Sequence, residues 1–353
     1  MTNKTILFVS DMTWGWGACA VAQGLRRQGW NVHEIDQCRF FPSWRSLPLR
    51  MVRHVLAPAI ARDYNRTIVE RAIALRPAPL VTMKGSYLSA KTLKEFTDAR
   101  IPTINYYPDF RFSYPDIDER TFVHYTHFFT TKSYQLDYLR GRLGAASRVS
   151  YLPHGYTPEI HKPPAYDGTL PKRYEYDIGY VGNHTAEKEH WLTAVRHRLP
   201  HRTLRIYGHR WRENVKSDAL RACCVDRTAE GVEYARAVYT ARINIAVHMG
   251  VADHTGWQDL TSMRTFEIPA CKGFMLHIDN DEVRSFYEVG KEIDAFNNID
   301  ELCDKIEYYL AHDQEREAMI ERAYCRCVPA YSYDERARTI SDFLYSISGI
   351  PSL

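Results

Sequence analysis

The sequence lacks three features, each of which would have pointed to a particular class of protein. No apolar run approaches the length of a membrane span, and no long apolar region follows the strand-like start, so neither a transmembrane helix nor a secretory signal is predicted. None of the eight cysteines stands in a CxxC pair, so we expect reduced thiols. The net charge is only +3, which gives no general case for nucleic-acid binding. These absences predict a cytoplasmic protein.

What is present is typical of a soluble globular protein. Apolar residues make up 45% of the chain and charged residues 25%. A length of 353 residues is too great for one ordinary core and suits two domains.

The first half of the chain alternates strand-like and helix-like segments. An apolar helix is predicted from about Cys19 to Arg27, ended by Gly29. Strands are predicted at 5–10, 31–36, 80–84, 103–107, 128–131 and 149–152. Strands and helices repeated in this order predict a parallel sheet with helices on both faces.

A proline-rich stretch at 153–174 then separates two similar α/β patterns. After it, strands are predicted at 176–181, 204–207, 243–247 and 273–278, and helices at 299–310 and about 332–347. We therefore expect a first domain at 1–165 and a second at 166–330. The last segment, 331–353, is expected to pack back on the first domain.

The most informative segment lies between Asp259 and Asp279. Asp259 and Glu267 stand eight positions apart with Arg264 between them, and an apolar helical turn and a strand-like run follow. The spacing predicts that a loop carboxylate, a cation and a helix-borne carboxylate meet at one helix N-terminus, a good place for an anionic ligand. Glu267 has apolar or small neighbours, so its carboxylate needs a partner if it is buried. The structural alternative is a carboxylate favoured by the helix dipole.

Polar residues also follow the predicted strands of the first half. Asp109 ends a strand, where α/β folds place ligands, and it could accept a proton from a hydroxyl or simply cap a turn. Lys84 ends another strand and could meet a phosphate or an acceptor. His154 lies at the domain junction, where a hydrogen bond to a ligand competes with a structural role.

Two short motifs favour other readings. Gly15, Trp16 and Gly17 begin a G-x-G-x-x-A pattern, with Asp36 ending the next strand, which suggests a nicotinamide dinucleotide. The preceding strand ends near residue 10, so the loop is longer than that fingerprint prefers, and we keep this as the lesser hypothesis. The Asp-Asn-Asp string at 279–281 follows a strand and begins a helix, so we interpret it as a cap and expect no required metal.

The segment Arg39–Arg76 is locally basic. It holds eight arginines and two acidic residues, so its net charge is +6, and Trp, Leu, Met and Val residues interleave with the arginines. An anionic acceptor, a membrane surface or nucleic acid could bind there, and a solvated helix lying on the core is the structural alternative. We therefore keep peripheral attachment to the inner membrane surface as an alternative to a free cytoplasmic location.

Several pieces of the second half, taken in order, resemble one known family. They are the segments 176–182, 205–211, 243–246, 264–276, 286–292 and 307–310. In the first half, 83–85, 106–109 and 152–155 fit the same pattern more loosely. Together they look like a CgeB-like (spore maturation type) glycosyltransferase of the GT-B fold.

The resemblance implies two Rossmann-like domains facing a central cleft. A nucleotide-sugar donor would be held mainly by the second domain and an acceptor mainly by the first. Glu267 would contact ribose hydroxyls, as its counterpart does in the wider, retaining relatives, and Asp259 would face the sugar, although Glu is more usual at that position. Arg264, and after it Lys188, would neutralise the leaving pyrophosphate without a metal ion.

The resemblance also implies which other residues line the two sites. The remaining donor-binding residues are Gly182, Asn183, Gly208 and Arg210, and the acceptor-cleft residues are Gly15, Trp16, Gly17, Lys84 and His154. Asp109 would act as a base if the reaction inverts the sugar.

The expected function is transfer of a sugar, hexosyl or pentosyl, from a nucleotide-sugar donor to an acceptor hydroxyl without a metal ion. The Asp-x7-Glu spacing favours retention of the sugar configuration. The competing hypotheses are a nucleotide-sugar epimerase of the same fold and a non-catalytic nucleotide- or glycan-binding protein. The acceptor stays open among glycans, proteins, small molecules and modified nucleic acid.

Overall fold

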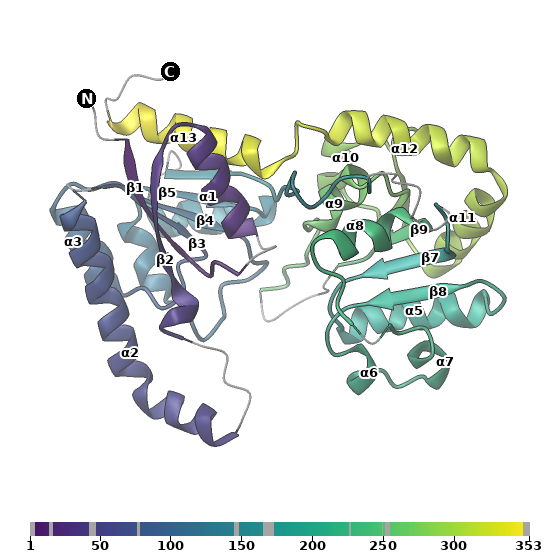
Figure 1. Ribbon diagram of the computed structural model, residues 1–353, viewed down its shortest axis with the longest axis horizontal. Coiled ribbons are helices and arrows are strands. Elements are labelled where there is room, and N and C mark those ends of the chain that lie inside the picture. The colour runs from purple at the N-terminus through teal and green to yellow at the C-terminus, as the bar shows by residue number, and fades with distance from the viewer. Residues whose placement is uncertain are drawn as a thin grey trace. The chain divides into compact units, whose positions relative to one another are not determined.

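The computed structural model describes residues 4–13, 17–41, 47–75, 78–144, 148–164, 173–225, 227–248, 250 and 255–348. Of residues 47–54 and 348 it describes the backbone alone. The chain forms two compact units, Met1–His154 with Tyr333–Leu353, and Gly155–Ser332 (Figure 1). Each unit has its own parallel sheet. No helix in the described ranges is both long and apolar enough to cross a membrane.

The first unit is built on a six-stranded sheet with the strand order β2-β1-β3-β4-β5-β6. Its strands are β1 Thr5–Ser10, β2 Asn31–Asp36, β3 Leu80–Met83, β4 Thr103–Tyr107, β5 His127–Thr130 and β6 Val149–Tyr151. Its α-helices are α1 Gly17–Arg27, α2 Leu47–Ala74, α3 Ala90–Asp98, α4 Leu136–Leu143 and α13 Tyr333–Ser348. Short 3-10 helices lie at η1 Gln37–Arg39, η2 Glu119–His124 and η3 Ser133–Gln135. Strands β1, β3 and β4 are buried along their whole length, as expected when helices cover both faces of a parallel sheet.

The second unit has a five-stranded parallel sheet with the strand order β11-β10-β9-β7-β8. Its strands are β7 Tyr176–Val181, β8 Leu204–Tyr207, β9 Ala241–Ala246, β10 Met275–Ile278 and β11 Asp294–Phe296. Its helices are α5 Ala186–Arg198, α6 Trp211–Asn214, α7 Asp218–Arg221, α8 Val232–Tyr239, α9 Arg264–Ala270, α10 Asp281–Phe286, α11 Ile299–Ala311 and α12 Asp313–Cys327.

Both sheets contain a topological switch point, where the chain order reverses between neighbouring strands. In the first unit it falls between β1 and β3, and in the second between β7 and β9. Open α/β sheets bind ligands outside the carboxyl ends of the strands at such a point. The fold therefore marks one position in each unit at which to look for a site.

The boundary of the second unit lies earlier in the chain than the sequence suggested. We predicted a division at 165/166, but residues from 155 onward belong to the second unit. The backbone N–H of Tyr156 donates to the carbonyl of Tyr331, and the His161 ring contacts Glu267. The proline-rich composition spans these residues, and composition does not reveal which side of a boundary their contacts favour.

The last helix, α13, packs beside α1 of the first unit (Figure 1). A Cβ atom placed on Gly24 of α1 would lie 2.6 Å from the Cβ of Ala337, so glycine lets the two helices approach. The Trp30 indole donates a hydrogen bond to Ser341 at 2.8 Å. The first unit is thus completed by residues from the end of the chain.

Candidate functional site

Arg264 lies at the switch point of the second unit. Its guanidinium donates to the carbonyl of Val247, just after β9, at 2.9 Å and approaches the carbonyl of Val181, the last residue of β7, at 3.5 Å. It also lies over the Tyr180 ring, 5.4 Å from the centroid. A Cβ atom on Gly182 would come within 2.5 Å of this guanidinium, so a side chain there would displace Arg264. The cation is therefore held at the place where this fold positions ligands.

A second cation, Lys188 on the first turn of α5, is buried near Arg264. Its side chain is only 5% exposed, and its ammonium donates to the carbonyl of Asn183 at 3.2 Å. Burial, reinforced by the charge of Arg264 and opposed by those of Asp259 and Glu187, lowers the pKa of Lys188 from 10.5 to about 7. Among the described residues, the hydrogen-bond partners of both cations are backbone carbonyls rather than carboxylates. The pair leaves positive charge that an anion can neutralise.

The loops that follow β7 and β8 are fixed to each other beside these cations. A Cβ atom on Gly208 would lie 2.1 Å from the carbonyl oxygen of Gly182, so the two backbones approach as closely as glycine permits. The same carbonyl accepts a hydrogen bond from the Trp211 indole at 2.7 Å, and the side chain of Asn183 accepts one from the backbone of His209 at 3.1 Å. The predicted residues Gly182, Asn183, Lys188 and Gly208 therefore come together. Arg210 lies exposed at the start of α6.

Glu267 is buried and has a partner that the sequence did not reveal. Its carboxylate lies 3.4 Å from Nε2 of His161, and both side chains are less than 9% exposed. Nδ1 of His161 accepts the backbone N–H of Thr157 at 2.9 Å, so the neutral ring carries its proton on Nε2, toward Glu267. Burial lowers the pKa of His161, although the charge of Glu267 opposes that shift. Burial and then Glu267 raise the pKa of the neighbouring Tyr234. The carboxylate thus sits in an apolar wall and points at a neutral hydrogen-bond donor.

Two buried histidines, His248 and His277, lie beside the segments that hold Arg264. Nε2 of His277, on β10, lies 2.9 Å from Nε2 of His248 and 3.0 Å from the Thr265 hydroxyl, while its Nδ1 lies 2.6 Å from the carbonyl of Ile278. The carbonyl can only accept, so Nδ1 carries the proton, and Nε2 presents its one lone pair to the donors His248 and Thr265. Burial lowers the pKa of His277 to about 4. His277 therefore joins the segment after β9 to the start of α9, the two segments that hold Arg264.

The predicted acid Asp259 lies in the loop before α9 and is half-buried. Its charge acts on Lys188, whose pKa it raises. Lys188 and Asp259 are thus electrostatically coupled, and Glu267 points to a separate part of the site.

The first unit has a polar cluster of its own at the ends of β3 and β4. The Lys84 ammonium lies 3.2 Å from Asp109 and 3.1 Å from Asp116, and Ser86 donates to Asp116 at 2.6 Å. Burial raises the pKa of Asp109, although Lys84 opposes the shift. Lys84 itself has a positive φ of 73°, a conformation that costs energy for a non-glycine residue. The structure joins two predicted residues, Lys84 and Asp109, and adds Asp116, which the sequence reading missed.

The remaining residues predicted to line an acceptor cleft have different environments. Gly15 and Trp16 lie outside the described residues. Gly17 begins α1, where a Cβ atom would come 2.6 Å from the Tyr333 hydroxyl, so packing explains this glycine. His154 is buried, its carbonyl accepts a hydrogen bond from Arg336 at 3.1 Å, and burial holds its pKa well below the usual value. His154 therefore fits the structural role that was its alternative.

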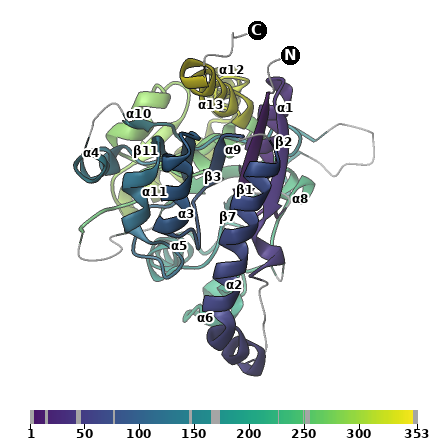
Figure 2. The ribbon, with the colours of Figure 1, turned by 90° about the vertical axis from the view of Figure 1, so that its left-hand side faces the viewer.

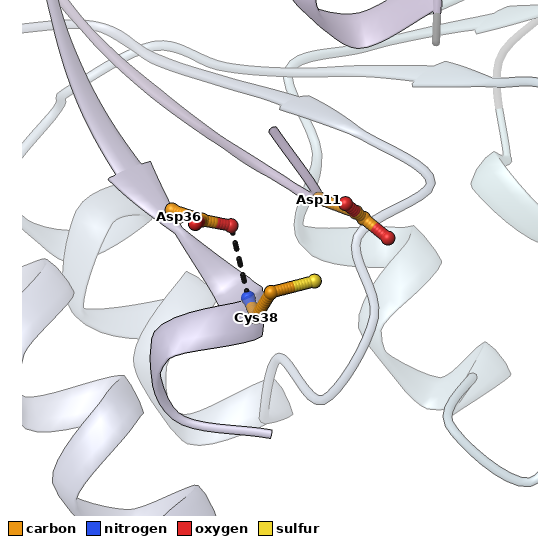
Figure 3. A group of neighbouring side chains, drawn as sticks. All are labelled: Asp11, Asp36 and Cys38. Atoms are coloured by element: carbon orange, nitrogen blue, oxygen red, sulfur yellow. Dashed lines mark hydrogen bonds between the residues drawn. The ribbon is translucent and has the colours of Figure 1, made fainter. Parts of the chain in front are cut away.

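Two acidic motifs act as caps. Asn280 accepts the backbone N–H of Val283 at 2.9 Å and begins α10, as the capping interpretation of 279–281 predicted. Asp11, Asp36 and Cys38 lie together at the ends of β1 and β2 (Figure 3). The Asp36 carboxylate accepts the Cys38 N–H at 3.0 Å, which caps η1. Asp36 was the acid expected of a dinucleotide fold, and its cap gives it a structural explanation.

His161, Tyr180 and Tyr234 are the site residues of the second unit that we did not predict. His161 lies in the proline-rich stretch that looked like a linker, and the two tyrosines looked like ordinary core residues of a strand and a helix. The one signal in the sequence was that Glu267 needs a partner if it is buried.

Comparison with known proteins identifies a family pattern in part of the chain. Residues 185–342 match the model of a family described as glycosyl transferase-like, a range that contains Lys188, Arg264 and Glu267. No curated protein sequence matches the chain.

Solved structures are similar over nearly the whole chain at low sequence identity. Sucrose-phosphate synthase from Thermosynechococcus elongatus has a TM-score of 0.70 at 12% identity, covering 98% of this chain and 100% of that one. Anabaena HepE in complex with UDP-glucose has a TM-score of 0.65 at 11% identity, covering 97% and 99%. UDP-GlcNAc 2-epimerase from Neisseria meningitidis has a TM-score of 0.55 at 10% identity, covering 97% and 100%. The chain therefore has the GT-B fold of two Rossmann-like domains, and its residues 185–342 carry the pattern of the glycosyl transferase-like family.

Proposed function

We propose that the protein is a glycosyltransferase of the CgeB-like type that moves a sugar from a nucleotide-sugar donor to an acceptor hydroxyl. The observation that carries the proposal is the pair of cations, Arg264 and buried Lys188, at the switch point of the second unit. Breaking a sugar–nucleotide bond creates a negatively charged diphosphate, and fixed cations in a partly desolvated site stabilise that charge. The glycosyl transferase-like match over the same residues supports this reading.

Each remaining group of the second unit has a role in this proposal. Glu267 accepts hydrogen bonds from the donor ribose, because a buried carboxylate facing a neutral His161 keeps acceptor capacity for hydroxyl groups. Asp259, coupled to Lys188, faces the sugar. Because two cations serve the diphosphate, the proposed reaction needs no metal ion, and we propose retention of the sugar configuration. The solved HepE complex contains UDP-glucose, so UDP and UDP-glucose are the first ligands to test.

In the first unit, Lys84, Asp109 and Asp116 are the proposed acceptor-binding residues. Asp109 is also the base that an inverting reaction would use, since burial raises its pKa toward that of an effective proton acceptor. Asp109→Asn separates the two outcomes. Under retention it weakens acceptor binding and leaves the maximal rate within a few-fold, whereas loss of a base lowers that rate by about 100-fold or more.

The first test is a thermal-shift panel of nucleoside diphosphates and their sugars in EDTA. A ligand that binds only the folded state raises the melting temperature by mass action. We expect a shift with one base family and its loss in Arg264→Ala. Lys291→Met is the matched surface control, because Lys291 is 66% exposed and pairs with Glu288. A shift with NAD(H) and none with any nucleotide diphosphate would refute the proposal.

A second test addresses the role of Glu267. If its carboxylate binds the ribose, the wild type binds UDP more tightly than 2′-deoxy-UDP, and Glu267→Gln shrinks that difference. A hydrogen bond to a charged group contributes about 1.5–3 kcal/mol, so the expected preference is roughly tenfold or more. An unchanged preference in the variant would remove Glu267 from the ribose site.

The epimerase alternative has a specific observation in its favour, since the fold is shared with UDP-GlcNAc 2-epimerase. An epimerase changes the sugar of its nucleotide donor with no acceptor present. A transferase leaves the donor sugar unchanged and releases the nucleotide when the acceptor is supplied. Product analysis by NMR, with and without a candidate acceptor, distinguishes the two.

A further inference from the structure

The N-terminal half of α2 extends away from the body of the first unit. The C-terminal half is anchored, because Tyr64, Asn65, Ile68 and Ala72 are buried. In contrast, none of residues 55–62 is buried. Figures 1 and 2 show this half of the helix running past the end of the sheet. The side chains of residues 55–62 are therefore wholly or partly exposed on this part of the helix.

The exposed half is apolar as well as exposed. Val55 is 77% exposed and Leu56 46% exposed, and Pro58 and Ala59 are exposed beside them. Single exposed aliphatic residues are common on protein surfaces, but a run of them on a projecting helix, left exposed by the part of the chain that the structure describes, is not. Such a run favours a partner that can accept apolar side chains.

The same stretch is strongly basic. Residues 47–62 of α2 include three arginines and no acidic residue, while the whole chain carries only +3. Arg62 has no ion pair among the described residues, whereas Arg66, one turn later in the anchored half, pairs with Asp63 at 2.5 Å. Residues 63–74 of the same helix instead carry two arginines and two acidic residues, so the net positive charge of α2 comes from its N-terminal part.

We infer that the N-terminal half of α2 docks the protein on an anionic lipid surface, with Val55 and Leu56 entering the headgroup region and Arg62, two helical turns further on, contacting the lipid phosphates. An interfacial helix binds through burial of its aliphatic side chains and through attraction of its arginines to anionic headgroups, and the two contributions add. No described helix can span a membrane, so the helix lies on the surface.

Nucleic acid and a second copy of the chain each explain only one of the two features, the positive charge or the exposed aliphatic residues. Nucleic acid would bind the arginines but gives the exposed aliphatic residues nothing to contact. A second copy of the chain would cover the aliphatic residues but would bring two basic segments of like charge together. An anionic membrane satisfies both features at once.

The test is co-sedimentation of the full chain with vesicles, in the absence of nucleotide, so that it does not depend on the proposed catalytic function. The vesicles are phosphatidylglycerol with phosphatidylcholine, or phosphatidylcholine alone. We expect binding to the anionic vesicles only, weakened by high salt. Val55→Glu should reduce the binding at least tenfold, and Arg62→Ser about fivefold.

Val232→Glu is the matched control. Val232 is 72% exposed on α8 of the second unit, so the same substitution there changes the same residue type at the same exposure. Retained binding by Val232→Glu with lost binding by Val55→Glu supports the inference, provided the melting temperatures of both variants equal that of the wild type.

Four outcomes would overturn it. Equal binding to both kinds of vesicle would refute the need for anionic lipid, and binding that Val55→Glu leaves unchanged would show that the helix is not the docking element. Duplex DNA that displaces the wild type from vesicles and binds Val55→Glu equally well would assign the basic segment to nucleic acid. Dimers in sedimentation velocity that Val55→Glu abolishes, without vesicle binding, would assign the surface to self-association.

Discussion

Replacing Lys188 by methionine is expected to stabilise the second unit and to abolish nucleotide-diphosphate binding at the same time. Lys188 is 5% exposed, and burial and the neighbouring Arg264 lower its pKa from 10.5 to about 7. A lysine held in this way opposes folding, because its charged form is less favourable in the native state than in the unfolded chain. Methionine has nearly the same length and no charge to desolvate.

The size of the effect follows from the pKa of Lys188. A change from 10.5 to about 7 costs about 4 kcal/mol of folding free energy at pH 7. Methionine forfeits the hydrogen bond to the carbonyl of Asn183, about 1 kcal/mol, and leaves that acceptor buried without this donor. We therefore expect a net gain of about 2 kcal/mol, a rise of about 4–8 °C in melting temperature for a domain of this size.

The same shift predicts how the gain depends on pH. The native pKa of Lys188 lies below the unfolded one, so between pH 7 and 10.5 the unfolded state binds more protons. The free energy of unfolding of the wild type therefore rises with pH in this window, by about 2 kcal/mol from pH 7 to pH 9 from this residue alone. Lys188→Met lacks that contribution, so its advantage shrinks as the pH rises.

Ligand binding should report the same proton. A bound diphosphate favours the charged ammonium, so binding near pH 7 takes up about half a proton, more at pH 8 and less at pH 6. Isothermal titration calorimetry in buffers of different ionisation enthalpy measures this uptake. Urea denaturation at pH 7 and 9, with Lys291→Met as the surface control, measures the stability. A variant less stable than the wild type at pH 7, or one that still binds the diphosphate with wild-type affinity, would refute the reasoning.

Two further substitutions test the framework around the cations. Gly208→Ala places a Cβ atom 2.1 Å from the Gly182 carbonyl and should lower the free energy of unfolding by about 3 kcal/mol in urea denaturation. The control is Gly141→Ala on α4, where the new Cβ atom has open space, and it should raise the free energy of unfolding by no more than about 1 kcal/mol. Equal effects would mean that the contact between the β7 and β8 loops is not fixed. His277→Gln should lose less unfolding free energy than the wild type as the pH falls. Burial lowers the pKa of His277 from 6.5 to about 4, and between these values the unfolded state binds more protons than the native state. The wild type should lose about 2 kcal/mol from this residue between pH 6.5 and 4.5 in urea denaturation, and an identical loss in the variant would contradict this assignment.

The fold was readable from the sequence because local pattern determines most of it. A buried parallel strand is a continuous apolar run, and β1, β7 and β8 lie at the predicted residues. Strand ends were less certain, as at β9, which begins at Ala241 rather than 243, because the charged Arg242 interrupts the apolar run by which the strand was predicted. The earlier domain boundary was missed for a different reason, since it depends on contacts across the chain that composition does not encode.

The site was readable to the extent that its residues follow strands or begin helices. Lys188 and Gly208 could be found by position alone, because loops after parallel strands gather at one edge. His161 could not, because its role comes from meeting Glu267 at a distant point of the chain. Nor could the sequence tell that His154 is enclosed by the last helix, since exposure is a property of tertiary packing.

The positions of Arg264 and Glu267 explain how one short helix can offer both charges to a ligand. Opposite charges three residues apart on a helix ordinarily attract each other and form a surface ion pair. Here the guanidinium turns to the carbonyls at the ends of β7 and β9, and the carboxylate turns to His161. Because neutral groups satisfy each charge, neither cancels the other. Under the proposed function Arg264 binds the diphosphate and Glu267 accepts a hydrogen bond from a ribose hydroxyl, so a substitution that let the pair close on itself would remove both subsites at once.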